Sequence, residues 1–194
     1  MKKQHVPQHM FVVCAAFAVA ILLAGSARAQ TATINVASNQ QTIDGFGFST
    51  AWTPAMTSAQ GNVLFGTGSG QLGFSLLRIR IDPNESWGNE PSNAATAHSH
   101  GAKVLGSAWT PPASMKNNDS TICGDLLSSQ YSAYAFHLNR AVSAIGLDFV
   151  SFQNEPDWCP NPGYESSNPT PAEIETWVAN DAPTVGKPIV VPEA

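Results

Sequence analysis

Basic side chains are scarce in this chain of 194 residues, which has nine Lys and Arg against fourteen Asp and Glu. Three of the nine lie within residues 1–29 and no acidic residue does, so the remainder carries six basic against fourteen acidic residues, a formal net charge of −8. Six scattered basic residues do not make a surface that follows the phosphates of a nucleic acid. The composition argues against a nucleic-acid partner and favours a substrate that is uncharged or held by a few placed residues.

Long apolar runs are also missing beyond the N-terminus. A membrane-spanning helix needs roughly 20 consecutive apolar residues, and the run FVVCAAFAVAILLAG at 11–25 is shorter. Two lysines precede it, and Ala-Arg-Ala at 27–29 has the small-x-small pattern of a signal-peptidase site. Residues 1–29 are therefore predicted to be an export signal, and residues 30–194 a secreted protein without a membrane span.

Cysteine and histidine are too sparse for a zinc site. Cys14 lies in the predicted signal, which leaves Cys123 and Cys159 in loops of an exported protein. An oxidising compartment favours a disulfide between them, and two free thiols are the alternative. His98 and His100 form the one close pair of histidines and are interpreted as polar residues at a helix end. We expect no metal and no cofactor.

Five short runs rich in Val, Ile, Leu and Phe indicate the strands of a parallel sheet. They alternate little between apolar and polar residues, as strands buried on both faces do. The runs are 42–48, 74–81, 103–109, 148–155 and 188–194, and TATINVA at 31–37 is a further candidate outside the main sheet.

Helical spacing separates the later runs. Apolar residues from Tyr131 to Ile145 recur at three- and four-residue intervals, with Ser128 or Ser129 predicted to cap the start and Gly146 to close the end. A second helix is predicted to begin at Thr170, which a proline follows. Strands that alternate with helices in this way predict a right-handed parallel α/β fold.

Polar and aromatic residues gather after the C-terminal ends of the strands. Trp52 follows the first run, Trp109 ends the third, and Asn154, Glu155 and Trp158 mark the end of the fourth. A (β/α)8 barrel builds its active site at this end of its strands. The distribution predicts a site where these residues converge.

The chain is short for a complete barrel of this type. A (β/α)8 barrel takes about 250 residues, and residues 30–194 supply five strands rather than eight. We interpret the chain as the first five strands of a truncated (β/α)8 TIM barrel, since its last residues are a bare strand end. A smaller open α/β sheet is the alternative.

Five motifs resemble, in order, those of glycoside hydrolase family 30. They are QTIDGFGFSTAW (41–52), LLRIRIDP (76–83), GSAWTPPASMKNN (106–118), QNEPDW (153–158) and IVVPEA (189–194). The family comprises retaining β-glycosidases with a (β/α)8 barrel and a small β-domain, and it includes glucuronoxylan-acting endo-xylanases, β-1,6-glucanases and glucosylceramidases. The stretch WTPPASMKNN is similar to the xylanase subgroup more than to the glucosylceramidases.

The resemblance implies roles for individual residues. Glu155 follows the Asn of the family's Asn-Glu-Pro motif and is expected to be the acid/base. The family's nucleophile lies on a later strand, and no residue of this chain matches its motif; Glu193 lies instead in the fifth-strand motif. Arg78 matches the second-strand arginine that orients the carboxylates, whereas Arg80 either does the same or pairs with Asp82.

Retaining hydrolysis needs an acid that protonates the leaving oxygen and a carboxylate about 5 to 5.5 Å away that attacks the anomeric carbon. Burial beside Trp158 would help Glu155 to keep the proton that it must donate. Asn154 can offer its amide to the sugar 2-hydroxyl. The indoles of Trp52, Trp109 and Trp158 can stack on sugar rings.

The leading hypothesis is a secreted retaining β-glycoside hydrolase of the endo-β-1,4-xylanase or glucuronoxylanase kind, with a polysaccharide as its substrate. Within the family, a glucosylceramidase or a β-1,6-glucanase is the alternative, and another barrel glycosidase family is a further one. A non-catalytic carbohydrate-binding fragment is the alternative from a different class. Because the nucleophile is missing, the chain alone is expected to be poorly active or inactive. The oligomeric state stays open.

Overall fold

The computed structural model describes residues 42–159, 164–191 and 193, together with residues 33, 35 and 37. The chain divides into two units, 1–42 and 43–194, and the fold below is that of the second. The predicted export signal, residues 1–29, lies outside the described residues, as does most of the strand candidate at 31–37.

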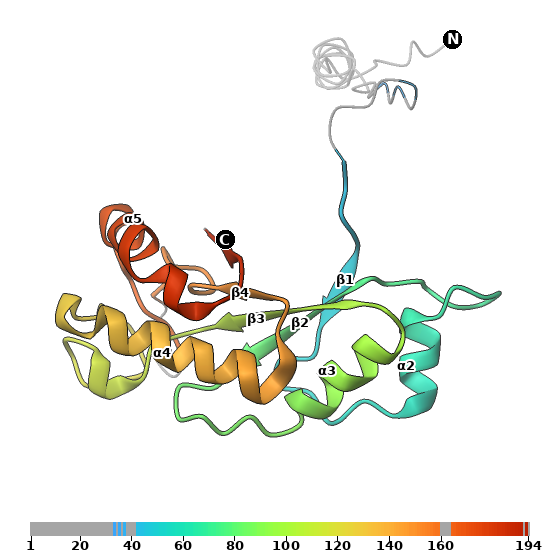
Figure 1. The fold of residues 1–194 in the computed structure, drawn as a ribbon, viewed down its shortest axis with the longest axis horizontal. Coiled ribbons are helices and arrows are strands. Elements are labelled where there is room, and N and C mark those ends of the chain that lie inside the picture. Colours follow the sequence, from blue (N-terminus) through green and yellow to red (C-terminus); the bar gives the residue numbers. More distant parts are fainter. Residues whose placement is uncertain are drawn as a thin grey trace, which may run out of the picture. The chain divides into compact units, whose positions relative to one another are not determined.

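Five parallel strands form one sheet, ordered along the chain from β1 to β5 (Figure 1). Their bounds are Gly47–Ser49 (β1), Leu76–Ile81 (β2), Lys103–Ala108 (β3), Phe149–Ser151 (β4) and Ile189–Val190 (β5). Four of the five predicted runs contain a whole strand, and β1 overlaps the first run but ends one residue beyond it, at Ser49. β4 is shorter than its run because it ends at Ser151, and the pairing beyond it continues as an isolated bridge between Asn154 and Glu193.

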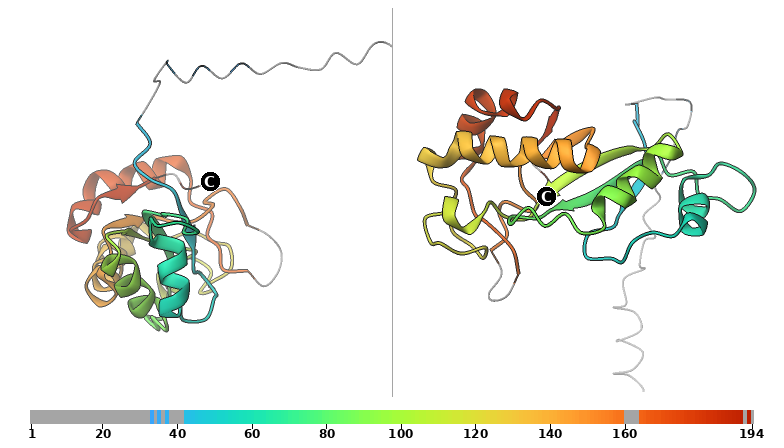
Figure 2. Two further views of the ribbon diagram at one scale, coloured as in Figure 1. Left: turned by 90° about the vertical axis from the view of Figure 1, so that its right-hand side faces the viewer. Right: turned by 60° about the horizontal axis from the view of Figure 1, so that its bottom comes forward.

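In the described part of the chain, four α-helices follow one another along one side of the sheet (Figure 2). They are α2 (Ser58–Phe65), α3 (Glu90–Ser99), α4 (Tyr131–Ala141) and α5 (Pro171–Asn180). Shorter turns flank them: 3-10 turns at Ala113–Met115, Ser128–Gln130 and Ala182–Val185, and a π-helical turn at Val142–Gly146. The strand and helix order is that of the predicted α/β fold.

The helix ends test the predicted caps. Thr170 caps α5 as predicted: its side chain accepts a hydrogen bond from the Glu173 N–H, and the Glu173 carboxylate accepts one from the Thr170 N–H at 2.7 Å. The cap predicted for α4 is wrong. Ser128 and Ser129 lie in a 3-10 turn, and the residue before the helix is Gln130. Gly146 ends the π-helical turn with a φ of 87°, as a glycine can.

The two faces of the sheet have different roles. In β2, Leu77, Ile79 and Ile81 are fully buried on the helix side. Because side chains alternate along a strand, Arg78 and Arg80 point to the opposite face. Burying each of the three apolar side chains contributes about 1.5 to 3 kcal/mol. One face therefore holds the fold together, which leaves the other face free to carry polar groups.

The core continues between the helices. Tyr134 of α4, Trp177 of α5 and Phe152 pack against one another, with ring centroids 4.9 to 5.8 Å apart. The Tyr134 hydroxyl donates to the Phe152 carbonyl at 2.7 Å, which satisfies a buried polar group. This cluster fixes α4 and α5 behind the residues that follow β4. Among the helices in the described ranges, none has the length and apolarity to traverse a bilayer.

Candidate active site

The polar face of the sheet brings together residues that are far apart in the sequence. Arg80 of β2 lies opposite Ser107 of β3, and Ser107 lies opposite Ser151 of β4. An isolated bridge between Asn154 and Glu193 extends the pairing of β4 and β5. The parallel register therefore sets the ends of β2 to β5 side by side, as expected for the site of a barrel fold.

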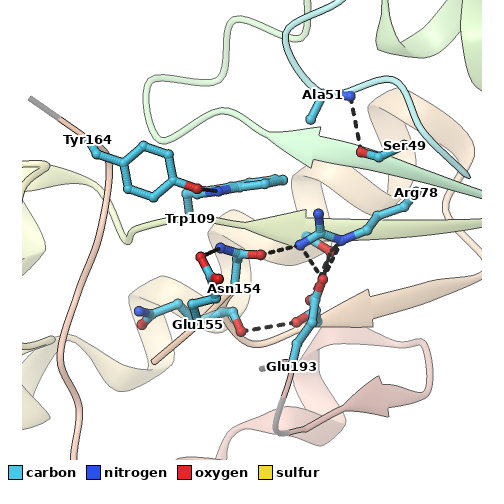
Figure 3. A network of polar contacts seen from close by, with 11 residues as sticks. Ser49, Ala51, Arg78, Trp109, Asn154, Glu155, Tyr164 and Glu193 are labelled. Carbon is cyan, nitrogen blue, oxygen red and sulfur yellow. Dashed lines mark hydrogen bonds and ion pairs between the residues drawn. The ribbon is translucent and has the colours of Figure 1, made fainter. Parts of the chain in front are cut away.

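Arg78 is the centre of the resulting network (Figure 3). Its guanidinium forms an ion pair with Glu193 and donates to the Ser107 hydroxyl at 3.0 Å and to Asn154 Oδ1 at 2.5 Å. The Ser107 hydroxyl lies 2.9 Å from both Glu193 oxygens. One side chain thus ties β2 and β3 to Asn154 and Glu193, which lie just beyond β4 and β5.

The network ends at Glu155. Because Asn154 Oδ1 accepts from Arg78, its Nδ2 faces the other way and donates to Glu155 Oε2 at 3.0 Å (Figure 3). The Glu155 N–H donates to the Glu193 carbonyl at 2.7 Å. Glu155 has a φ of 44°, in the left-handed region that costs a non-glycine residue about 1 to 3 kcal/mol. The hydrogen bonds to Asn154 and to the Glu193 carbonyl hold Glu155 in a backbone conformation that it would otherwise avoid.

The expected burial of Glu155 beside Trp158 is wrong for the described chain. Both side chains are exposed, Trp158 by 55%. The reason is that the sheet is covered by helices on one side only, and Glu155 lies at the other. In the described residues Trp158 makes no ring contact with Trp52 or Trp109, and its backbone N–H donates to the Glu155 carbonyl.

Three aromatic residues form an aromatic wall beside the network: Trp52, Trp109 and Tyr164. Trp52 and Trp109 meet edge to face, with ring centroids 6.1 Å apart. The Trp109 indole N–H donates to the Tyr164 hydroxyl at 2.5 Å, and Figure 3 shows these two side chains together. Arg78 lies over the Trp109 ring at 4.5 Å. Trp52 is 61% exposed and Trp109 only 4%. Sequence reasoning missed Tyr164, whose only signal is an aromatic residue in a polar loop.

The loop that carries Tyr164 is clamped to the loop after β3. Cys123 and Cys159 form a disulfide across 36 residues. The Cys123 N–H donates to the Ser166 hydroxyl at 3.0 Å, and the buried ammonium of Lys116 donates to the Ser166 carbonyl at 2.7 Å and to the Thr110 hydroxyl at 2.8 Å. Burial lowers the pKa of Lys116 to about 8, although Asp125 and Glu165 oppose the shift. The clamp holds one side of the site rigid.

Two hollows of the structure lie away from this network. A groove of about 820 Å³ runs along α5 and is lined mainly by apolar side chains such as Ile174, Val178 and Pro169. A smaller one, about 320 Å³, lies at the N-terminal ends of the strands, beside Asp44 and Lys103. Neither contains a residue of the Arg78 network. Within the described residues no three His, Cys, Asp or Glu side chains converge as a metal site would require.

A parallel sheet in chain order, helices on one side of it, and polar residues converging beyond the strand ends define an incomplete (β/α)8 barrel. The structure of the glycoside hydrolase family 30 subfamily 8 xylanase Xyn30A from Clostridium acetobutylicum matches with a TM-score of 0.73 and 35% identity, over 83% of this chain and 45% of that one. A family 30 endoxylanase from Clostridium papyrosolvens C71 matches with a TM-score of 0.68 and 33% identity, over 79% and 43%.

A curated relative agrees with the structures. The glucuronoxylanase XynC of Bacillus subtilis (strain 168) is 37% identical, over 86% of this chain and 41% of the relative. The chain thus spans about two-fifths of the length of this relative. Comparison with models of protein families finds no match. Over the part that the relatives cover, the chain belongs to glycoside hydrolase family 30, and the fold expected from the resemblance is confirmed.

Proposed function

We propose that the chain is the acid/base-bearing part of a secreted retaining β-glycoside hydrolase that acts on xylan. The observation that carries the proposal is the continuous set of contacts from Glu193 through Arg78 and Asn154 to Glu155 at the C-terminal end of β4. Xylanase activity of the relatives named above supports the choice of glycan. Export is supported by residues 1–29 and by the Cys123–Cys159 disulfide, since disulfides persist in oxidising compartments.

In this mechanism Glu155 gives its proton to the glycosidic oxygen as the bond to the anomeric carbon breaks, and later takes a proton from the attacking water. Before substrate binds, the Asn154 amide N–H donates to Glu155, and in the complex it donates to the sugar 2-hydroxyl instead. Arg78 keeps Asn154 in place by donating to its Oδ1. The exposed indole of Trp52, together with Tyr164, holds sugar rings, buried Trp109 supports both of them, and exposed Trp158 provides a further stacking surface.

We assign the nucleophile to no residue of this chain. Glu193 is bound on both oxygens by Ser107 and paired with Arg78, and we give it the role of holding Arg78. The chain by itself is then a poor catalyst that still binds sugar. A non-catalytic carbohydrate-binding role is the second candidate, and it is favoured by the same exposed indoles.

The first test is binding. Titrating the 194-residue chain with xylohexaose should change its tryptophan fluorescence, since two indoles of the proposed surface are exposed. Glu155→Gln should bind with unchanged affinity because the amide keeps the shape of the side chain. A chain that shows no sugar-dependent change would refute both candidate functions.

The second test separates catalysis from binding. In any form of the protein that hydrolyses xylan, Glu155→Gln should lose turnover by a factor of about 100 or more, the loss of a general acid. With an aryl xylobioside, whose leaving group needs no protonation, the same change should lower the rate of the bond-breaking step far less. Equal losses on both substrates would exclude Glu155 as the acid/base. Glu175→Gln, which changes an exposed glutamate on α5, serves as the control.

A further inference from the structure

Arg80 of β2 reaches two loops above the sheet. Its guanidinium donates to both oxygens of Glu165, from Nε at 2.9 Å and Nη2 at 2.5 Å, and Nη1 donates to Asp82 at 2.6 Å. Its Cζ lies 4.1 Å from the ring centroid of Trp52, in cation–π contact. The side chain is only 13% exposed. One buried guanidinium therefore contacts residues of two loops, Glu165 and Trp52.

The two loops carry two members of the aromatic wall. Trp52 follows β1, and Glu165 is the residue next to Tyr164, in the segment before α5. Trp52 and Tyr164 each contact Trp109. Arg80 thus contacts Trp52 directly and is tied to Tyr164 through the neighbouring Glu165.

The conformation of Trp52 needs such support. Its φ is 67°, in the left-handed region that is unfavourable for a bulky residue. Trp52 is also largely exposed, so little packing besides Arg80 and Trp109 holds its indole. A guanidinium under one face of the ring stabilises this placement and leaves the other face open.

The bidentate contact is one that only arginine can make. The planar guanidinium matches both carboxylate oxygens, which a lysine ammonium cannot do. Burial alone would lower the pKa of Arg80, but the hydrogen bonds and charges of Glu165 and Asp82 outweigh this and raise it. The positive charge under Trp52 is therefore permanent at any pH at which the protein is folded.

We propose that Arg80 is a positioning residue for sugar binding, which sets the spacing of Trp52 and Tyr164 across Trp109 without touching the sugar itself. The inference rests on the proposed function, because the wall is read as a surface for sugar rings. It concerns a different group from the Arg78 network, which acts on Glu155.

The experiment is a double-mutant cycle on the 194-residue chain, with xylohexaose as the probe and isothermal titration as the measurement. Arg80→Met keeps the apolar stem and should weaken binding about tenfold, as the loss of a supported stacking surface does. In a Trp52→Ala background the same change should weaken binding less than about threefold, since Arg80 then has little left to position. Arg140→Met, which removes an exposed arginine paired with Glu85, is the matched control and should bind as the wild type does.

A readout without sugar tests the positioning itself. Arg80→Met should change the near-ultraviolet circular dichroism that arises from the Trp52–Trp109 contact and raise amide exchange at residues 164–168. Glu165→Gln breaks only the loop contact and should raise the exchange while it leaves the dichroism in place. Unchanged far-ultraviolet dichroism shows that each variant is folded.

The outcomes are distinct. Equal loss of affinity in both backgrounds means that Arg80 touches the sugar, and this would overturn a positioning role. Unchanged near-ultraviolet dichroism and exchange in folded Arg80→Met would also overturn it, whether or not sugar binds. If the wild type binds no xylohexaose while the spectra change as expected, the proposed function fails and the sugar role of Arg80 fails with it.

Discussion

Lys116 should make the free energy of unfolding of this protein rise as the pH increases above neutrality. Its side chain is 1% exposed and its ammonium donates to two uncharged oxygens, those of Thr110 and Ser166. Burial lowers the pKa from 10.5 to about 8 in the folded chain. At pH 7 the amine is charged in both states, so the folded state bears the full cost of burying the charge.

The sign follows from proton binding. As pH rises past 8 the folded chain loses its proton, whereas the unfolded chain keeps it until about pH 10.5. The unfolded state then binds more protons, so the free energy of unfolding increases with pH. Between pH 7 and pH 9.5 these two values give a gain of about 2 kcal/mol. Above pH 10 the raised pKa values of buried Tyr134 and of Tyr131 act in the opposite direction, which fixes the upper end of the window.

Urea unfolding at pH 7 and at pH 9.5, followed by far-ultraviolet circular dichroism, measures this gain. Lys116→Met should abolish the difference between the two pH values, whatever its effect on absolute stability. Lys187→Met, which changes an exposed lysine, should retain it. A wild type with no gain, or a Lys116→Met chain with the same gain, would refute the assignment of the effect to the buried ammonium.

Three further changes test the fold. Cys123→Ser should lower the free energy of unfolding by about 4 kcal/mol, the loop-closure value for a 36-residue separation. In urea titrations, dithiothreitol should lower the free energy of unfolding of the wild type to the same level and leave that of the variant unchanged. Gly47→Ala should cost about 1 to 3 kcal/mol because its new Cβ would lie 2.0 Å from the Leu76 carbonyl oxygen, and an unshifted urea midpoint would contradict the β1–β2 packing. Thr170→Ala should cost about 1 kcal/mol, whereas Ser128→Ala, which removes no cap, should cost almost nothing in the same assay.

The sheet could be predicted from the sequence because each strand is a local apolar run. In Leu76 to Ile81 the buried residues and the two arginines alternate along the strand, so the expectation of burial on both faces is wrong for β2. The cap at Thr170 was likewise predictable from a local pattern of Thr, Pro and Glu. The cap of α4 was not, because two serines before a helix do not show whether the chain enters it through an extended residue or through a 3-10 turn.

The site was predictable only in part. Asn154 and Glu155 stand beside a strand end and a proline, which is a local signal. The contacts of Glu165 are not local: this carboxylate pairs with an arginine 85 residues earlier, and nothing near it in the sequence indicates that partner. The exposure of Trp158 also depends on which side of the sheet the helices cover, which the motif does not state.

The two arginines of β2 show how one strand can serve two purposes. Arg78 and Arg80 share a face and are separated by about 6.6 Å along the strand, at roughly 3.3 Å per residue. Arg78 lies opposite Leu105 on β3, and its guanidinium extends across the sheet to Ser107, Glu193 and the Asn154 amide. Arg80 lies opposite Ser107, but its guanidinium extends to the loops, where it contacts Glu165, Asp82 and Trp52. This division of contacts predicts that Arg78→Lys alters the Asn154–Glu155 pair, whereas Arg80→Lys leaves that pair as it is and raises amide exchange at residues 164–168. A chain in which both variants disturb the Asn154–Glu155 pair equally would show that the face acts as one cooperative unit and that the division argued from the contacts is wrong.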